Sequence, residues 1–323
     1  MTILRTVARL ALALAPAFAF AQGYPTKPVK MIIPFAPGGA SDFVGRIFQS
    51  RLGELLGQQV VIENRAGASG NIGLEAAARS APDGYTIYLG NVGTVAINPA
   101  VFTKLTVKPL RDFIPVTQVV DVPGVLVSHP SLQASSLKDM VAIAKAHPGK
   151  LNYASPGSGS QNRLEMELVR KAYGLDMVHV PYKGGAGPAV AGLIAGETHM
   201  MFTTISSAMP HIQSGRLKAL VVVAGKRLPA LPQVPTMVES GHPDSVSGSW
   251  QGIFVPAGTP KEIVDRLYAA VLQTMKSSEV VERLARGGVE VVTSASPAAF
   301  ASFVAADTQR WGRVAKDSGA TVD

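Results

Sequence analysis

Residues 29–42 read VKMIIPFAPGGASD, and this stretch decides the fold class. The run 29–35 is almost wholly apolar, which is typical of a strand covered on both faces. A loop with two glycines follows, and Ser41 or Asp42 occupies the position expected for a helix N-cap. Apolar residues then recur at helical spacing until Gly57, which can end the helix in the left-handed conformation. Such a strand–loop–helix unit is the building block of a parallel α/β sheet.

The same alternation of strands and helices continues along the chain. Predicted helices lie over 71–80, from 136 to just before 148, and up to 173. Further strands are expected at 59–63, 85–89, 116–120, 125–127, 151–154, 178–181, 217–223, 252–255 and 289–292. The sequence therefore predicts an α/β fold throughout.

Three loops share one design. After Phe35, after Ala154 and after Pro181, a predicted strand leads through a glycine-rich loop into a helix. In an open α/β sheet such loops gather beyond the C-terminal ends of the strands, where ligands bind. Glycine lets the backbone approach a ligand, and the free amides of a helix N-terminus attract an anion. One such glycine can serve the turn alone, but three such loops favour an anion-binding cleft.

Composition narrows the possible functions. The chain has 323 residues, 47% of them hydrophobic and 16% charged, which indicates a folded protein of about two domains. It has no cysteine, which excludes disulfides, thiolate metal sites and a cysteine nucleophile. The net charge of +8 includes no run of four basic residues. A diffuse positive field suits small anions better than nucleic acid.

The N-terminus has the features of a cleavable signal peptide. Arg5 and Arg9 precede an apolar stretch that ends in Ala-Phe-Ala before Gln22. A membrane anchor is the alternative, but about 20 apolar residues are needed to span a bilayer. Cleavage after residues 1–21 would remove two arginines and leave a net charge of 8 − 2 = +6. We therefore predict export to the periplasm.

The motifs of common enzymes are missing. There is no G-x-x-x-x-G-K-[ST] phosphate loop and no G-x-S-x-G nucleophile elbow. The six histidines show no metal-ligand spacing, and Glu165 and Glu167 point in different directions on a helix. The sequence thus predicts no catalytic residue, metal site or cofactor. Asp42 is the one carboxylate singled out, either as a helix cap or as a ligand contact.

Seven motifs occur in the order found in one receptor family. They are PFAPGGASD (34–42), ENRAGA (63–68), PDGYT (82–86), VPYKGG (180–185), SGRLKAL (214–220), VPTMVESG (234–241) and VPAGTP (255–260). The chain resembles the substrate-binding proteins of tripartite tricarboxylate transporters, the Bug (Bordetella uptake gene) or TctC-like receptors. This resemblance implies a type II periplasmic-binding-protein fold of two α/β lobes. The first lobe would comprise residues 22–123 and 227–323, and the second residues 124–226.

The resemblance also implies which residues contact the ligand. In the first lobe they are Phe35, Gly38, Gly39, Ser41, Asp42, Asn91 and Thr94. In the second lobe they are Ser155, Gly157, Ser158, Gly159, Ser160, Tyr182, Gly184, Gly185 and Thr203 or Thr204. Two positions depart from the family pattern, Arg163 where relatives commonly have His, and His199 where they often have Asp. Either departure could alter the pocket or the hinge.

The implied function is that of a monomeric periplasmic receptor. It would capture a small organic carboxylate between its lobes and deliver it to the small and large membrane subunits of a transporter. The scarcity of charged residues in the loops favours a mono- or dicarboxylate over a tricarboxylate. Aromatic carboxylates, amino acids and amides remain open as ligands. The alternatives are a secreted α/β enzyme acting on a carboxylate and a ligand-sensing subunit for a signalling partner.

Overall fold

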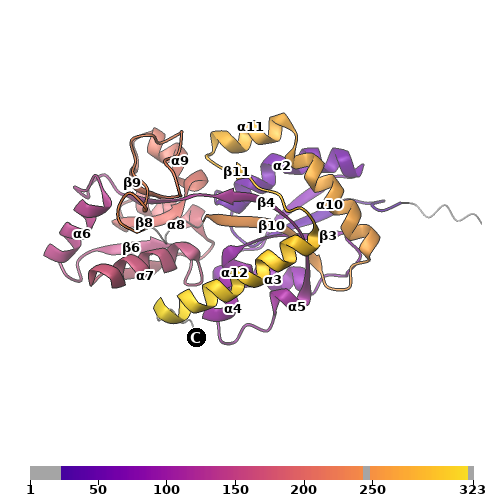
Figure 1. The fold of residues 1–323 in the computed structure, drawn as a ribbon, viewed down its shortest axis with the longest axis horizontal. Coiled ribbons are helices and arrows are strands. Elements are labelled where there is room, and N and C mark those ends of the chain that lie inside the picture. The colour runs from indigo at the N-terminus through magenta and orange to yellow at the C-terminus, as the bar shows by residue number, and fades with distance from the viewer. Residues whose placement is uncertain (1–22, 243–247, 319–323) are drawn as a thin grey trace, which may run out of the picture.

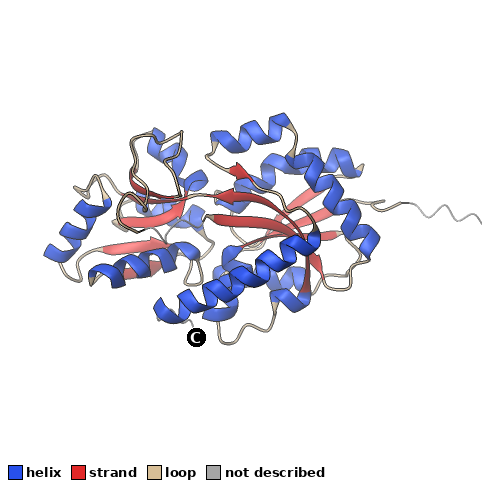
Figure 2. Ribbon diagram, in the orientation of Figure 1, coloured by secondary structure: helices blue, strands red, loops and turns tan. Residues whose placement is uncertain are grey.

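The chain forms two β-sheets with helices packed on both faces of each (Figures 1 and 2). The structure is a computed structural model that describes residues 23–242 and 248–318. The predicted signal peptide, residues 1–21, lies outside the described residues. Among the helices in the described ranges, none combines the length and the apolar character that crossing a bilayer requires.

Six strands form the first sheet: β1 (Val29–Ile33), β2 (Val60–Asn64), β3 (Thr86–Asn91), β4 (Phe113–Val122), β10 (Ser249–Pro256) and β11 (Glu290–Val291). Their spatial order is β11-β4-β10-β3-β1-β2. β1 pairs in parallel with β2 and β3, whereas β10 pairs antiparallel with β3 and β4. A strand from late in the chain is thus inserted between strands from its first part.

Helices from the first and the last part of the chain cover both faces of the first sheet. They are α2 (Ala40–Leu56), α3 (Asn71–Ala78), α4 (Asn98–Val101), α5 (Pro109–Asp112), α10 (Lys261–Met275), α11 (Ser278–Arg286) and α12 (Pro297–Ser318), with the short turns η1 (Ala68–Gly70) and η2 (Gly93–Ile97). We call the first sheet with these helices the first lobe.

Five strands form the second sheet, in the spatial order β7-β6-β8-β5-β9. They are β5 (Gly124–Ser128), β6 (Asn152–Ser155), β7 (Val178–Pro181), β8 (Met200–Thr204) and β9 (Lys218–Val223). Their helices are α6 (Leu137–Ala146), α7 (Gln161–Tyr173), α8 (Ala186–Ile194) and α9 (Ile205–Gln213). We call this second sheet with its helices the second lobe.

The chain crosses between the lobes twice. Pro123 joins β4 of the first sheet directly to β5 of the second, and the chain returns to β10 of the first sheet after β9 of the second. Helix α12 also reaches the second lobe, where Lys171 Nζ on α7 donates a hydrogen bond to the carbonyl oxygen of Asp317 at 2.9 Å (Figure 1). A cleft between lobes joined in this way can open and close by a hinge motion.

The first strand and helix show how closely the sequence pattern is followed. In β1, Val29, Met31 and Ile33 face one hydrophobic core and Ile32 faces the other, as expected for a strand buried on both faces. Gly57 ends α2 in the left-handed conformation, with φ of 75°. The predicted N-cap at Ser41 or Asp42 is wrong.

The residue at the N-cap of α2 is Gly39, and the helix begins one residue later at Ala40. Gly39 has extended backbone angles (φ −89°, ψ 172°) and no side chain with which to cap the helix. Ser41 and Asp42 therefore lie inside the first turn. The amides at this end of α2 donate no hydrogen bond to an N-cap side chain, which leaves them available to a ligand.

Candidate ligand-binding site

A cavity lies between the two lobes, with about 560 Å³ of unfilled space that includes its opening to solvent. The described residues that line it are Phe35, Gly39, Ala40, Ser41, Ser69, Asn91, Val92, Gly93, Pro156, Gly159, Ser160, Gln161, Asn162, Ala186, Thr204, Ser249 and Gln251. None of these carries an ionisable side chain. Across the described ranges, no three His, Asp or Glu side chains are grouped as metal ligands. Recognition in this cavity must therefore come from backbone amides, hydroxyls and side-chain amides.

Four helices begin at the wall of this cavity. Helices α2, α8 and α9 have Gly39, Gly185 and Thr204 as N-caps, none of which makes a side-chain capping hydrogen bond. Helix α7 is capped by Ser160, whose hydroxyl accepts from Arg163 N. The first amides of a helix have no intrahelical acceptor, and they lie at the positive end of the helix dipole. Several such ends around one uncharged cavity favour a bound anion.

The loops of the two lobes touch each other beside the cavity. Ala36 N in the first lobe donates to the carbonyl oxygen of Gly184 in the second, at 2.8 Å. Gly159 N in the second lobe donates to Ser69 Oγ in the first, at 3.4 Å. The structure therefore describes the closed arrangement of the lobes.

The residues named from the sequence divide into two groups in this structure. Phe35, Gly39, Ser41, Asn91, Gly159 and Ser160 line the cavity, together with Thr204 of the pair Thr203 or Thr204. Those that are not among the lining residues are Gly38, Asp42, Thr94, Ser155, Gly157, Ser158, Tyr182, Gly184, Gly185 and Thr203. Most of the second group shape the loops that carry the first.

Asp42 positions the first glycine-rich loop. Its carboxylate accepts hydrogen bonds from Gly38 N at 3.1 Å, Arg46 Nε at 2.9 Å and Asn64 Nδ2 at 3.1 Å. Burial works to raise the pKa of Asp42, but these hydrogen bonds and the Arg46 charge outweigh it and hold the pKa below its ordinary value. An ionised Asp42 thus ties the loop to α2 and β2.

Thr94 performs a similar task after β3. Its hydroxyl accepts from Tyr88 OH at 2.8 Å, and its amide donates to Asn91 Oδ1 at 3.0 Å. Both Tyr88 and Thr94 are fully buried. Asn91 is therefore held at the cavity wall by a hydrogen-bonded turn.

Steric packing explains the glycines that lie just behind the cavity. A Cβ at Gly185 would lie 2.7 Å from the Phe35 ring, and one at Gly157 would lie 2.6 Å from Ser69 Oγ. Both glycines have positive φ, which other residues rarely adopt. They allow the loops of the second lobe to approach the first.

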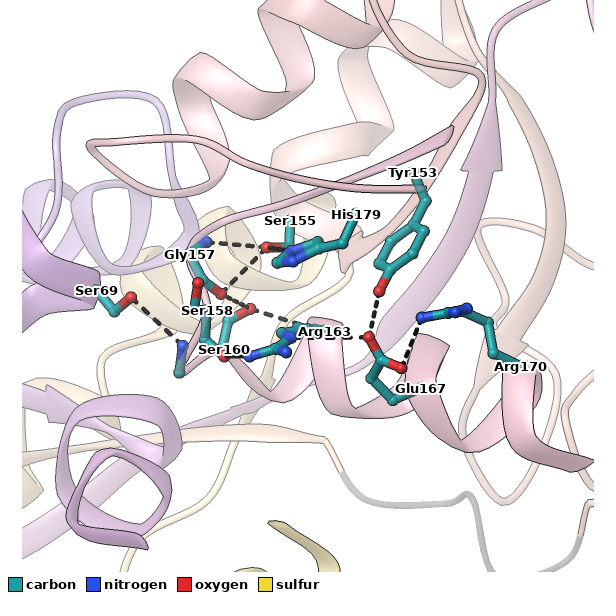
Figure 3. A network of polar contacts seen from close by, with 11 residues as sticks. Ser69, Tyr153, Ser155, Gly157, Ser158, Ser160, Arg163, Glu167, Arg170 and His179 are labelled. Atoms are coloured by element: carbon teal, nitrogen blue, oxygen red, sulfur yellow. Dashed lines mark hydrogen bonds and ion pairs between the residues drawn. The ribbon is translucent and has the colours of Figure 1, made fainter. Parts of the chain in front are cut away.

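The loop after β6 is held in shape by the polar network of Figure 3. Ser155 Oγ lies 2.7 Å from His179 Nε2 and accepts a hydrogen bond from Gly157 N. Burial, assisted by the nearby Arg163 charge, lowers the pKa of His179 to about 4, so the imidazole is neutral at pH 7. Arg163 Nη1 donates to the carbonyl oxygen of Ser158 at 3.0 Å. Arg163, the first departure from the family pattern, therefore stabilises this loop without lining the cavity.

The second departure, His199, lies beside β6 and is not among the cavity residues. Its Nδ1 is 2.7 Å from Asn152 Oδ1. Tyr182, predicted as a ligand contact, instead donates a hydrogen bond from its hydroxyl to Glu197 Oε2 at 2.6 Å. Thr203 and Thr204 are successive residues at the end of a strand, so their side chains point to opposite faces and one of them lines the cavity.

Several cavity residues were not predicted from the sequence. Ser69 belongs to the turn η1 and has a left-handed φ of 54°, a conformation that serine rarely adopts and that no sequence pattern here indicates. Gln161 and Asn162 follow the loop that was predicted, and their amides extend its polar surface. Ser249 and Gln251 come from β10, a strand whose polar residues interrupt the apolar pattern.

A buried carboxyl group lies beneath two of these amides. Glu165 is 7% exposed, and its oxygens accept from Gln161 Nε2 at 2.9 Å and Asn162 Nδ2 at 3.4 Å. Burial raises the pKa of Glu165 to about 8, against the opposing effect of these hydrogen bonds. The side chain is therefore largely protonated at neutral pH.

This burial predicts a specific dependence of stability on pH. Between its ordinary pKa and about 8, Glu165 binds a proton in the folded state and releases it on unfolding. The free energy of unfolding should therefore fall as the pH rises from about 5 to about 8. In Glu165→Gln the side chain stays neutral, and this part of the decline should vanish. Urea unfolding of both proteins at several pH values measures the difference, and parallel pH profiles would contradict the prediction.

The sequence of residues 44–320 matches the family described as "Tripartite tricarboxylate transporter family receptor", TctC. The chain belongs to this receptor family. Its members are binding proteins, so the secreted-enzyme alternative is wrong. Solved structures of a periplasmic transporter and of a periplasmic binding protein share the fold, each with a TM-score of 0.89. The predicted family and fold class are confirmed.

Individual relatives cover nearly the whole receptor. BugT of Bordetella pertussis is 38% identical over 301 residues, which are 93% of this chain and 92% of that protein. MatC from Rhodopseudomonas palustris with bound malate has a TM-score of 0.85 and 34% identity, over 90% of this chain and 99% of that one. Rpa4515 of R. palustris with adipate has a TM-score of 0.88 and 34% identity, over 93% and 100% of the two chains.

Proposed function

We propose that this receptor binds one small organic carboxylate in the cavity between its lobes. The observation that carries the proposal is the convergence of the first turns of α2, α7, α8 and α9 on a cavity without ionisable side chains. Helix N-termini can neutralise a carboxylate through backbone amides alone. The malate and adipate bound to the two relatives are carboxylates, which supports the same chemistry here.

The proposed lobes are residues 22–123 with 227–323, and residues 124–226. The crossing at Pro123 supports the first boundary. Met237 is buried in the core of the second lobe, and its amide donates to the carbonyl oxygen of Val222 on β9, so the second crossing follows residue 237. Each lobe supplies part of the polar lining, so a ligand that bridges both lobes gains contacts only in the closed state. Binding then shifts the population from open to closed.

The closed receptor would deliver its ligand to the small and large membrane subunits of a tripartite transporter. Only the closed form presents both lobes to these subunits in one fixed arrangement, which lets them distinguish the loaded receptor from the empty one. The family description supports this partner. The receptor would act as a monomer in the periplasm after cleavage of residues 1–21.

The experiment is a binding screen of the chain that begins at Gln22, freed of bound ligand by unfolding and refolding. The panel comprises malate, adipate, aliphatic monocarboxylates, aromatic carboxylates and amino acids, each with its neutral amide. A carboxylate at about 100 times its dissociation constant should stabilise the protein by about 2.7 kcal/mol, and its fully neutral analogue should not. If no carboxylate raises the unfolding temperature, or if the bound compound is chemically converted, the proposal is wrong. Ligand uptake by vesicles that contain the membrane subunits should require this receptor.

A further inference from the structure

One polar side chain of the cavity has neither end of its amide satisfied by the protein. Gln251 lies on β10, is 1% exposed and lines the cavity. Within the described ranges, neither its Oε1 nor its Nε2 has a hydrogen-bond partner. A buried donor or acceptor that has no partner destabilises the protein, because it has lost its hydrogen bonds to water without replacement. An amide left in this state at a ligand cavity is placed to bind the ligand.

The other amides nearby have protein partners. Gln118, a buried glutamine on the neighbouring strand β4, donates from Nε2 to the carbonyl oxygen of Val120 at 3.3 Å. Asn91, which lies opposite Gln251 in the β3–β10 register, accepts from Thr94 N. Asn162 donates to Glu165. Gln251 therefore differs from its neighbours in having both a donor and an acceptor to offer.

The chemistry of a primary amide defines the group that satisfies it. It presents one carbonyl acceptor and N–H donors side by side. A carboxamide has the same arrangement and can form two hydrogen bonds with it in a closed ring. A carboxylate only accepts, so it would satisfy Nε2 and leave Oε1 facing a negatively charged oxygen. No ionisable side chain lines the cavity to balance a second negative charge.

We propose that the side-chain amide of Gln251 forms hydrogen bonds with a neutral carboxamide on the ligand. The preferred ligand is then an ω-amido acid, the monoamide of a dicarboxylic acid. This inference rests on the proposed function, in which the single carboxylate of the ligand is held at the helix N-termini. It predicts a different preference from that suggested by the malate and adipate of the relatives. The ligand contact is made by one strand residue of the first lobe, beside Ser249.

The first test compares matched ligands on the unmodified, ligand-free protein by isothermal titration calorimetry. Succinamate, glutaramate and adipamate are compared with succinate, glutarate and adipate, and with butyrate, pentanoate and hexanoate. At the best chain length, the monoamide should bind at least about tenfold more tightly than the dicarboxylate. If each dicarboxylate binds as tightly as its monoamide, the inference is overturned while the proposed function stands. If no carboxylate of any kind binds, both fail.

The second test removes the amide. Gln251→Leu should weaken monoamide binding at least about tenfold and leave binding of the corresponding monocarboxylate unchanged or stronger. Gln118→Leu is the matched control, because Gln118 is a buried glutamine on the adjacent strand that does not line the cavity. It should bind the monoamide like the unmodified protein. Equal losses for monoamide and monocarboxylate in Gln251→Leu would overturn the role given to Gln251.

Discussion

Replacing Gly159 by alanine should weaken ligand binding by about ten- to a hundredfold and leave the ligand-free protein almost as stable as before. Gly159 lies in the second lobe and lines the cavity. A Cβ at this position would lie 2.0 Å from Asn98 Oδ1 and 2.8 Å from Phe102 Cε2, both in the first lobe. The added methyl group would therefore obstruct closure.

The atoms that the new methyl group would meet cannot easily move. Asn98 is fully buried, and its Nδ2 donates to the carbonyl oxygen of Ser69 at 3.0 Å and to Asn71 Oδ1 at 2.6 Å. Overpacking at such a rigid contact typically costs about 1–3 kcal/mol. Because the contact joins the two lobes, this penalty applies to the closed state and is absent when the lobes separate. Gly159 does not have positive φ, so alanine adds no backbone strain of its own.

Titration of the tightest-binding carboxylate of the panel into both proteins measures the effect, together with their unfolding temperatures without ligand. Gly225→Ala is the control, because Gly225 has no atom within 4 Å of its Cβ position and lies in the crossing segment after β9. It should bind like the unmodified protein. Unchanged affinity in Gly159→Ala would show that binding does not require the closed contact described here.

The sequence predicts the architecture well where burial and periodicity act together. The apolar run at 29–33 predicts a strand buried on both faces, and β1 is such a strand. Gly57 predicts a left-handed helix end, and α2 ends there in that conformation. The three glycine-rich loops are also local patterns, and the structure brings parts of all three to one cavity through Phe35, Gly159 and Ala186. In all three loops the backbone comes close to the cavity, and the glycines that allow this are visible in the sequence.

The remaining cavity residues depend on contacts between distant parts of the chain. Gln251 lies in a strand that is longer than predicted, because the half-buried Ser249 and the buried Gln251 are polar residues in an otherwise apolar segment. A polar residue in such a segment predicts exposure unless the cavity beside it is known. The N-cap at Gly39 could not be predicted from the sequence either, because a glycine has no side chain that would mark it as a cap. Tertiary placement, and not local propensity, decides both.

The core of the first lobe depends on Phe300, and Phe300→Ala should lower the free energy of unfolding by about 3–5 kcal/mol. Phe300 on α12 is fully buried, and its ring lies 5.3 Å from that of Phe254 and 5.9 Å from that of Trp250, centroid to centroid. Its Cζ also occupies the space above Gly252, only 2.3 Å from where a Cβ would be. Neighbours so closely fitted to the ring cannot collapse into the space it would leave.

Phe303 provides the matched control on the same helix. It is 41% exposed, although its ring centroid lies 5.7 Å from that of Trp250. Phe303→Ala should therefore lower the free energy of unfolding by only about 1 kcal/mol. Urea unfolding of the three proteins measures both losses, and equal losses would contradict the assignment of Phe300 as the core residue. Trp250 and Gln251 are successive residues of β10 and so face opposite sides of the sheet. Phe300→Ala should therefore destabilise the lobe while leaving the ligand affinity of the folded receptor close to that of the unmodified protein.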